Sequence, residues 1–348
     1  MTHYARALGP ALITSIALAL SVLVVAALVA PVAQARKLTA ANWNVSQQRS
    51  IVALGVMTSS PSGFSGAAAL TGQAADEALT AAATRLELPA PAPTSTSTGA
   101  TITVTQFDAL LVDGVGLGDV ATHVEQVARA AGLRPPSYFG TEVLARSLGL
   151  RYDHPAGEDS LELYPSEAIT RAEGAHSFAE LLHEGGWALE AARGTFEAFS
   201  LPHYDADQLR VLRIAVSKIG MPYVWGGTTD DTADGLEHGG YDCSGFAWRV
   251  YKVSGLPWGA DIRGRTAAEQ AGEIPRSARV PLAEVEPADL LFFGSARLHS
   301  KTTASNVDHE GIALSGEWAI HSSGQGVYVL PLDSGWLAQQ FSWARRVL

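Results

Sequence analysis

The sequence predicts an α+β protein in which a mainly helical first half precedes a domain of helices and antiparallel strands. Three observations support this prediction. Helical patterns that open on threonine recur within residues 42–200. Apolar residues then recur at helical spacing over residues 207–219 and again after Cys243. Short apolar runs of strand length, separated by turn residues, fill most of the chain after residue 289.

The first residues have the pattern of an export signal. No residue from Ala7 to Ala35 is charged, and residues 33–35 (Ala-Gln-Ala) have the small-x-small form of a cleavage site. We therefore expect residues 1–35 to be a signal peptide. A retained membrane anchor is the open alternative, because the apolar stretch is long enough to span a bilayer, which takes roughly 20 residues. Both outcomes predict that the rest of the chain lies outside the cytoplasm.

Charge and motif content exclude several classes of function. The formal net charge is -11 and the isoelectric point is about 5.3, which argues against nucleic acid as a partner because phosphate binding needs a basic surface. The sequence contains no His-Glu-x-x-His motif, and a single cysteine cannot form a zinc cluster. We expect no metal and no cofactor.

The upstream region is predicted to consist of helices around one linker. Residues 89–100 alternate proline with small residues and then threonine with serine, which indicates an extended linker. Residues 42–88 are alanine-rich and predict a helix over 72–86 that is capped by Thr71. Within residues 101–200 the pattern predicts a helix over 119–131, then helices that open at Thr141 and Thr170.

This upstream pattern resembles the S-layer homology module, whose hallmark is a Thr-Arg-Ala-Glu tetrad at the start of a helix. Residues 170–173 match the tetrad in full, whereas Thr71 and Thr141 open degraded versions. The resemblance implies that residues 42–88 and 101–200 are repeats of this kind. It also implies that Arg171 binds an anionic cell-wall polymer. A simple capping box between Thr170 and Glu173 is the open alternative.

Residues 205–348 are predicted to form a separate domain. An amphipathic helix over 207–219 begins it, and a second helix runs from Cys243 to about Val253. Four strands follow at residues 290–293, 311–314, 318–321 and 327–330.

Cys243 is the only cysteine of the chain, so an internal disulfide is excluded. A buried inert side chain, an intermolecular bridge and a nucleophile are the three interpretations. The motif Asp-Cys-Ser-Gly at 242–245 places Cys243 in the first turn of the second helix. There the helix dipole is expected to lower the thiol pKa, and free N–H groups could bind an oxyanion. We therefore favour the nucleophile.

A thiol nucleophile needs an imidazole that moves its proton. Of the ten histidines, His309 and His321 lie at strand edges after the helix. If residues 315–317 form a three-residue turn, Leu314 pairs with Trp318, and the two histidines become diagonal neighbours on one face, within about 7–8 Å. A turn of two or four residues would place them on opposite faces.

A helix that carries the thiol, followed by a sheet that carries histidines, is the plan of a papain-like fold. The domain resembles the NlpC-type cysteine peptidases of bacterial cell walls in several blocks. These blocks are Gly-Met-Pro-Tyr-Val-Trp-Gly-Gly at 220–227, Asp-Cys-Ser-Gly-Phe at 242–246, Arg-Thr-Ala-Ala-Glu-Gln at 265–270, Pro-Ala-Asp-Leu-Leu-Phe-Phe at 287–293, His-Glu-Gly-Ile-Ala-Leu at 309–314 and Ile-His-Ser at 320–322.

The resemblance implies a role for each matching residue. Cys243 would be the nucleophile, His309 the base and His321 the polar group that orients it. Substrate-binding roles are implied for three more residues, which are Tyr223, Asp242 and Ser244. For Asp242 a plain helix cap is the open alternative, and for Tyr223 and Trp225 the open alternative is core packing.

Two of the departures from the family pattern concern the surroundings of the site. Residues 228–241 form a long acidic insert, for which we expect the role of a lid or wall. Glu310 stands where an apolar residue is usual, and it would raise the pKa of His309 if the two side chains approach.

The sequence therefore predicts a secreted or cell-wall-associated hydrolase that cleaves peptide bonds of peptidoglycan stem peptides, held near the wall by its upstream repeats. The open alternatives are a non-catalytic wall-binding protein with a peptidase-like domain and a thiol acyltransferase of the same fold.

Overall fold

The computed structural model describes residues 38–348 apart from residues 93–98, 153, 156, 233–234, 299–302 and 334. The expected signal peptide at 1–35 and the middle of the expected linker at 89–100 therefore lie outside the described residues. Residues 38–348 form one compact unit. No helix in this described part of the chain is both long enough and apolar enough to cross a bilayer.

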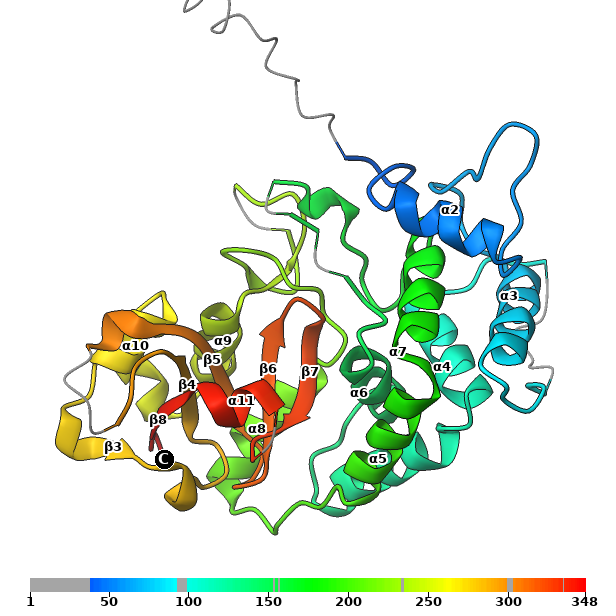
Figure 1. Ribbon diagram of the computed structural model, residues 1–348. Helices are drawn as coiled ribbons and strands as arrows, with labels where there is room; N and C mark the ends of the chain where they lie inside the picture. The colour runs from blue at the N-terminus through cyan, green and yellow to red at the C-terminus, as the bar shows by residue number, and fades with distance from the viewer. Residues whose placement is uncertain are drawn as a thin grey trace, which may run out of the picture. The chain divides into compact units, whose positions relative to one another are not determined.

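The first part of this unit, residues 38–200, is helical and is called the helical half below (Figure 1). Its helices are α2 (Val45–Ala53), α3 (Gly72–Arg85), α4 (Val104–Gly114), α5 (Gly118–Ala130), α6 (Phe139–Ser147) and α7 (Arg171–Glu197), with a short 3-10 helix at Asp159–Leu161. The predicted helices at 72–86 and 119–131 are confirmed within one residue at each end. The predicted start at Thr141 is wrong, because the Glu142 amide already donates to the Tyr138 carbonyl and α6 begins at Phe139.

Three helix starts lie side by side in the helical half. Thr71, Thr103 and Thr170 each cap a helix by accepting a hydrogen bond from the backbone N–H three residues later. Single β-bridges join Thr71 to Thr101, Ala69 to Thr170 and Thr103 to Ala168. The Thr103 start went unrecognised in the sequence, although its reciprocal capping box with Gln106 is a readable signal.

Residues 205–348, called the sheet half below, combine helices with an antiparallel sheet. The helices are α8 (Ala206–Ser217), α9 (Cys243–Ser254), α10 (Ala267–Gly272) and α11 (Gly335–Gln340), with 3-10 helices at Pro257–Asp261, Arg276–Ala278, Leu282–Glu284 and Ala304–Asn306. The strands are β1 (Thr228–Thr229), β2 (Gly240–Tyr241), β3 (Arg279–Val280), β4 (Leu290–Gly294), β5 (Val307–Ala313), β6 (Trp318–Ser323), β7 (Gly326–Pro331) and β8 (Phe341–Arg345). All four predicted strands and both predicted helices are confirmed.

The main sheet has the order β3-β8-β4-β5-β6-β7, with antiparallel neighbours throughout. One face packs on α9, where Ile312 and Ile320 join Phe246 in the main core. The other face is covered by a smaller cluster that includes Phe293 of β4 and Leu337 of α11. The sheet therefore lies between two apolar layers, which agrees with the continuous apolar run of β4, whose successive side chains point to opposite faces.

The helical and sheet halves are packed directly against each other. The guanidinium of Arg146 on α6 pairs with Glu142 at 2.8 Å, donates to the Gly220 carbonyl at 2.6 Å and also donates to the Gln325 carbonyl. Phe196 and Phe199 contact Trp318 at ring-centroid distances of 5.5 and 4.8 Å. The end of α7 and the start of β6 therefore share one apolar core.

Candidate active site

Cys243 is the first residue of α9, and its neighbours explain why the helix starts there. Asp242 is the N-cap, and its Oδ1 accepts a hydrogen bond from the Gly245 amide at 2.6 Å. A Cβ atom at Gly245 would lie 2.0 Å from the Gly227 carbonyl oxygen, so only glycine permits this close approach. The Asp-Cys-Ser-Gly motif at 242–245, which suggested a nucleophile, therefore also forms the start of α9 on which Cys243 lies.

The start of α9 lies at a fork between β5 and β6. Pairing of these two strands ends at Gly311 and His321. Beyond that pair, the Ser322 hydroxyl donates to the Tyr241 carbonyl at 2.7 Å, which holds the residues before α9 beside β6. A backbone hydrogen bond from Glu310 reaches the Cys243 thiol. The sulfur therefore lies against β5, beside the residue that follows His309.

The two histidines meet as the turn length predicted. The Leu314 amide donates to the Trp318 carbonyl at 2.7 Å, which confirms a three-residue turn and the expected register. His309 Nε2 and His321 Nδ1 are 2.8 Å apart, and the rings are nearly perpendicular. His321 is fully buried, whereas His309 keeps a partly exposed edge. Since one nitrogen of His309 is bound to His321, its Nδ1 is the nitrogen left for proton exchange.

The ionisation of the thiol differs from the expectation. Burial raises the pKa of Cys243 to about 12, the charges of Asp242 and Glu310 act in the same direction, and backbone hydrogen bonds from Ser244 and Glu310 only partly oppose them. The expected lowering by the helix dipole is therefore wrong for the free protein, because desolvation and like charge outweigh it. Burial likewise lowers the pKa of His309 to about 4. The resting state is a neutral thiol beside neutral imidazoles.

His321 is neutral for two reasons. Burial lowers its pKa well below the usual value, and the neighbouring His309 lowers it further, since two imidazolium ions cannot share this space. No group of three His, Cys, Asp or Glu residues among those that the structure describes is arranged to hold a metal ion.

Glu310 is an unusual feature beside the thiol. Its side chain is fully buried, and neither carboxylate oxygen has a hydrogen-bond partner among the described residues. Burial raises its pKa well above the usual value, with Asp242 adding to the rise and Arg345 opposing it. We expected Glu310 to raise the pKa of His309 by lying close to its ring. The structure shows no such effect, because burial alone shifts the pKa of His309, and it lowers it.

We expect Glu310→Gln to stabilise the protein at alkaline pH. The folded-state pKa of Glu310 lies above its unfolded value, so its contribution to stability is present at low pH and is lost as pH rises through the folded pKa. Glutamine cannot ionise, so at pH 8 the free energy of unfolding of the variant should be about 1–3 kcal/mol larger than that of the native protein. It should also lower the pKa of the Cys243 thiol, because one like charge is removed.

Urea unfolding at pH 5 and pH 8, and the pH dependence of thiol alkylation by iodoacetamide, measure these two effects. Glu317→Gln is the matched control, because Glu317 is exposed in the turn of the same hairpin. An equal stability difference at both pH values would contradict the assignment of a buried, titrating Glu310.

The predicted substrate-binding residues surround the start of α9, but two of them are occupied within the chain. Asp242 forms a two-point ion pair with Arg265 at 3.0 and 2.8 Å and accepts from the Gly226 amide at 3.0 Å. Ser244 is buried and donates to the Arg265 carbonyl at 2.8 Å. The helix-cap interpretation of Asp242 is confirmed, while the substrate roles of both residues stay predictions.

Tyr223 is partly exposed and lines a small cavity together with Arg146 and Tyr152 of the helical half. Its neighbour Trp225 is 68% exposed, so the alternative of core packing is wrong for that residue. Residues 228–241 are closed at their base by pairing of β1 with β2. The Tyr241 hydroxyl donates to Asp230 within this segment at 2.6 Å.

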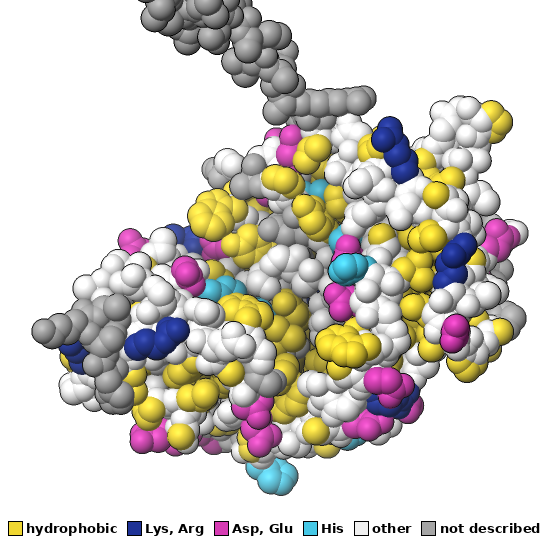
Figure 2. Space-filling model, viewed as in Figure 1, with side chains coloured by type: hydrophobic (Ala, Val, Ile, Leu, Met, Phe, Trp, Pro, Cys, Tyr) yellow, Lys and Arg dark blue, Asp and Glu magenta, His cyan; other side chains and the backbone are white. Residues whose placement is uncertain are grey.

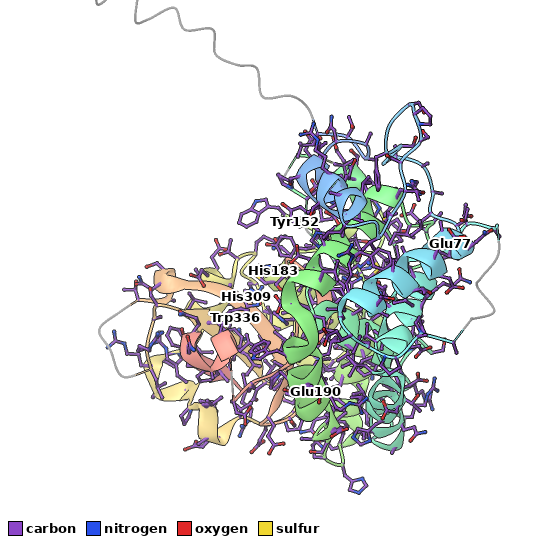
Figure 3. The ribbon with its side chains drawn as sticks, turned by 45° about the vertical axis from the view of Figure 1, so that its right-hand side comes forward. Glu77, Tyr152, His183, Glu190, His309 and Trp336 are labelled. Carbon is purple, nitrogen blue, oxygen red and sulfur yellow. The ribbon has the colours of Figure 1, made fainter. Side chains whose placement is uncertain are left out.

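Trp336 is a neighbour of the histidine pair that sequence reasoning missed. Its ring lies 5.1 Å from His309 and 5.9 Å from His321, measured between centroids, and Figure 3 shows it beside His309. It belongs to α11, 27 positions after His309, and no sequence signal connects the two. The wall of the site next to the histidines is therefore aromatic.

Arg171 lies in the helical half, at the start of α7. Its Nε donates to the Phe64 carbonyl at 3.1 Å, its second guanidinium nitrogen donates to the Thr58 carbonyl at 2.6 Å, and the charge lies 4.7 Å from the centre of the Phe64 ring. The Thr170 cap is confirmed, since it accepts from the Glu173 amide at 3.1 Å. In this structure Arg171 holds the segment between α2 and α3, and polymer binding by it stays a prediction.

Comparison with known proteins matches the sheet half to one family. A model of the NlpC/P60 family matches residues 220–346. Murein DD-endopeptidase MepH of Escherichia coli is 28% identical over 145 residues, which cover 40% of this chain and 47% of that protein. A gamma-D-glutamyl-L-lysine dipeptidyl-peptidase of Bacillus cereus is 27% identical over 214 residues, covering 59% of this chain and 57% of the relative.

A probable endopeptidase of Mycobacterium tuberculosis is 29% identical over 130 residues, or 37% of this chain and 27% of the relative. The chain thus spans between 27% and 57% of the length of these three relatives. Among solved structures, the NlpC/p60 domain of peptidoglycan hydrolase SagA is 30% identical, with 40% of this chain and 97% of that chain covered and a TM-score of 0.29. An NlpC/P60 family protein from Bacillus cereus is 24% identical, with 43% and 42% covered and a TM-score of 0.32.

Two of these relatives are named endopeptidases, one is named a dipeptidyl-peptidase, and SagA is named a peptidoglycan hydrolase. The matched segment contains the α9 start, the histidine hairpin and all six strands of the main sheet. Residues 220–346 of this chain therefore form a domain of the NlpC/P60 family.

Proposed function

We propose that this protein is a secreted cysteine endopeptidase that cleaves a peptide bond in peptidoglycan stem peptides. The observation that supports this most strongly is the fork between β5 and β6, where the Cys243 thiol lies beside β5 and the His309–His321 pair is joined at 2.8 Å. A peptidoglycan substrate is inferred from the relatives, since MepH is named a murein endopeptidase and SagA a peptidoglycan hydrolase.

The proton must leave the thiol during the attack in this mechanism. With pKa values of about 12 for Cys243 and about 4 for His309, a preformed thiolate–imidazolium pair is scarcely populated at neutral pH. His309 Nδ1 takes the thiol proton as the sulfur bonds to the peptide carbonyl carbon. The Cys243 amide, in the first turn of α9, then stabilises the oxyanion, since the Gly245 amide is already bound to Asp242.

Collapse of the tetrahedral intermediate completes the first half of the reaction. The C–N bond breaks, and His309 returns the proton to the leaving amine. Water then attacks the thioester, with His309 as base, and releases the acid product and the thiol. Throughout, His309 Nε2–H donates to His321 Nδ1, so His321 fixes the tautomer that leaves Nδ1 free.

Digestion of purified peptidoglycan tests the proposed function. New amino and carboxyl termini identified by mass spectrometry would name the bond that is cut, and the Cys243 variant described below serves as the blank. Products in which the acyl group is joined to an added amine, with no hydrolysis, would instead indicate a thiol acyltransferase. Binding to peptidoglycan with no new termini and no labelling by a thiol-directed probe would indicate a non-catalytic wall-binding protein.

The helical half is proposed to hold the enzyme at the wall through an anionic polymer. We expect Arg171→Ala to reduce retention on sedimented cell walls several-fold while leaving turnover of a soluble stem peptide unchanged, because Arg171 lies in the helical half and not at the fork. The melting temperature must be recorded too, since the variant also loses the bonds to Thr58 and Phe64. Arg129→Ala, at an exposed arginine of α5, is the control. Equal retention of both variants would leave Arg171 a purely structural role.

A further inference from the structure

A groove follows the line where the helical half meets the sheet half, next to the histidine pair. One hollow of about 390 Å³ is lined by Leu148 and Glu184 from the helical half and by Leu330 and Trp336 from the sheet half. A second hollow of about 230 Å³ shares Leu148, Glu184 and Leu330 with the first and adds Trp187. Because they share lining residues, the two hollows form one groove, called the α7–α11 groove below.

Figure 2 shows hydrophobic side chains along this hollow between the two halves. In Figure 3, Trp336, which lines the first hollow, lies beside His309, and the second hollow continues along α7 from Glu184 to Phe196. Volumes of this size are typical of sites for small ligands, about 300–1,000 Å³. The groove therefore begins at the candidate active site and leads away from it along α7.

The walls of the groove present two tryptophans to solvent. Trp336 is 41% exposed and contacts the His309 ring, whereas Trp187 is 77% exposed, further along the groove. Gly185 interrupts α7 with φ 71° and ψ -176°, a conformation that favours glycine, directly between Glu184 and Trp187. The break in α7 thus lies between two residues that line the groove, and the Trp187 indole is exposed to solvent. Both features indicate a surface that binds a ligand.

The strand beside the groove is poorly suited to an extended peptide. β7 is an edge strand, and its outer side is already used at Val327, which donates to the Met221 carbonyl at 2.8 Å and accepts from the Gly220 amide at 2.9 Å. At the other end, Pro331 has no N–H to offer. Only Val329, between them, could present both an amide and a carbonyl outward, so a peptide cannot add itself to this edge as a strand.

Charge narrows the class of ligand further. Glu184 is exposed at the rim of the groove. Arg146 also lines the groove, but its guanidinium is already bound to Glu142 and to two backbone carbonyls. An anionic polymer would be repelled here. Sugar rings without charge present apolar C–H faces that pack on indole, together with hydroxyl and acetamide groups that bond to polar side chains such as Ser147 at the rim.

We propose that the α7–α11 groove binds an uncharged amino-sugar chain, with sugar rings stacked on Trp336 and Trp187. Given the proposed function, this chain is the glycan strand of the peptidoglycan whose stem peptide reaches Cys243. Recognition of the glycan beside the reacting peptide would let the enzyme distinguish stems attached to a strand from free peptides.

Binding of chitohexaose, an uncharged chain of six N-acetylglucosamine units, tests this proposal independently of catalysis, whereas glycan chains stripped by an amidase would carry a free lactyl carboxylate on every second sugar. The full-length protein with Cys243→Ala is titrated with chitohexaose by calorimetry. We expect Trp187→Ala in that background to weaken binding at least about fivefold, as loss of an aromatic contact typically does. Trp258→Ala, which removes a tryptophan that is 38% exposed outside the groove, should leave binding unchanged.

Kinetics on two substrates give the second readout. Trp187→Ala with Cys243 intact should raise KM for intact peptidoglycan and leave turnover of a free stem peptide unchanged. Absence of glycan binding, equal binding by the Trp187 and Trp258 variants, or a Trp187 effect on the free peptide instead of the glycan would each overturn the proposal. If no stem peptide is cut by the native protein, the proposed function fails, while the titration still decides on the groove.

Discussion

Replacing Cys243 with serine is expected to lower hydrolysis of peptidoglycan stem peptides by about 10⁴-fold or more. The oxygen nucleophile would have to lose its proton to an imidazole whose pKa is only about 4. A hydroxyl is a much weaker acid than the thiol, so the transfer to His309 becomes far less favourable at the transition state.

The variant should nevertheless fold like the native protein. Cys243 is 9% exposed, and serine differs from it by one atom. Turnover of a soluble stem peptide measures the first effect, and circular dichroism with a melting curve measures the second. Cys243→Ala, which has no nucleophile at all, sets the background rate. Activity of the serine variant close to native would rule out attack by this sulfur.

Replacing His309 with glutamine is expected to cost about 10³-fold in kcat, within the range of a lost general base. The same change at His321 should cost less, about 10–100-fold, because His321 acts only by orienting the His309 ring. Turnover of a soluble stem peptide measures both losses, and His203→Gln, at an exposed histidine before α8, is the control.

The pH profile of the native enzyme checks the same assignment. His309 has a pKa of about 4 and Cys243 of about 12, so kcat/KM should be level from about pH 5 to pH 9 and fall below pH 5 as His309 becomes protonated. An acid limb near pH 6.5 would show that the base titrates like an exposed imidazole. Losses of equal size at His309 and His321 would contradict their different roles.

The geometry of the histidine pair was predictable because it depends on local chain features. Short apolar runs mark β5 and β6, and the Ser-Gly-Glu turn at 315–317 sets their register. The start of α9 was equally readable, since Asp242 is a strong N-cap and glycines surround it. Both features arise within a dozen residues of chain.

The ionisation of the thiol was not predictable in the same way. The helix dipole at Cys243 is a local effect, whereas the desolvation and the charge of Glu310 come from β5, more than sixty positions away. The contact of Trp336 with His309 and the exposure of Trp225 likewise depend on how separate elements pack. Sequence patterns identify which side chains can react, but the packing of the folded chain determines their burial and therefore their pKa values.

The bonds of Arg146 have a consequence for how the protein can be divided. A binding module on a flexible tether can be exchanged for another, because the catalyst does not depend on its orientation. Here one guanidinium ties α6 to the carbonyl of Gly220, where the NlpC/P60 match begins, and to the carbonyl of Gln325, between β6 and β7. If residues 220–346 were fused to an unrelated binding module, those two carbonyls would lose their hydrogen-bond donor and the Trp318 ring would become exposed. The helical half and the sheet half would therefore have to be exchanged together, as one unit.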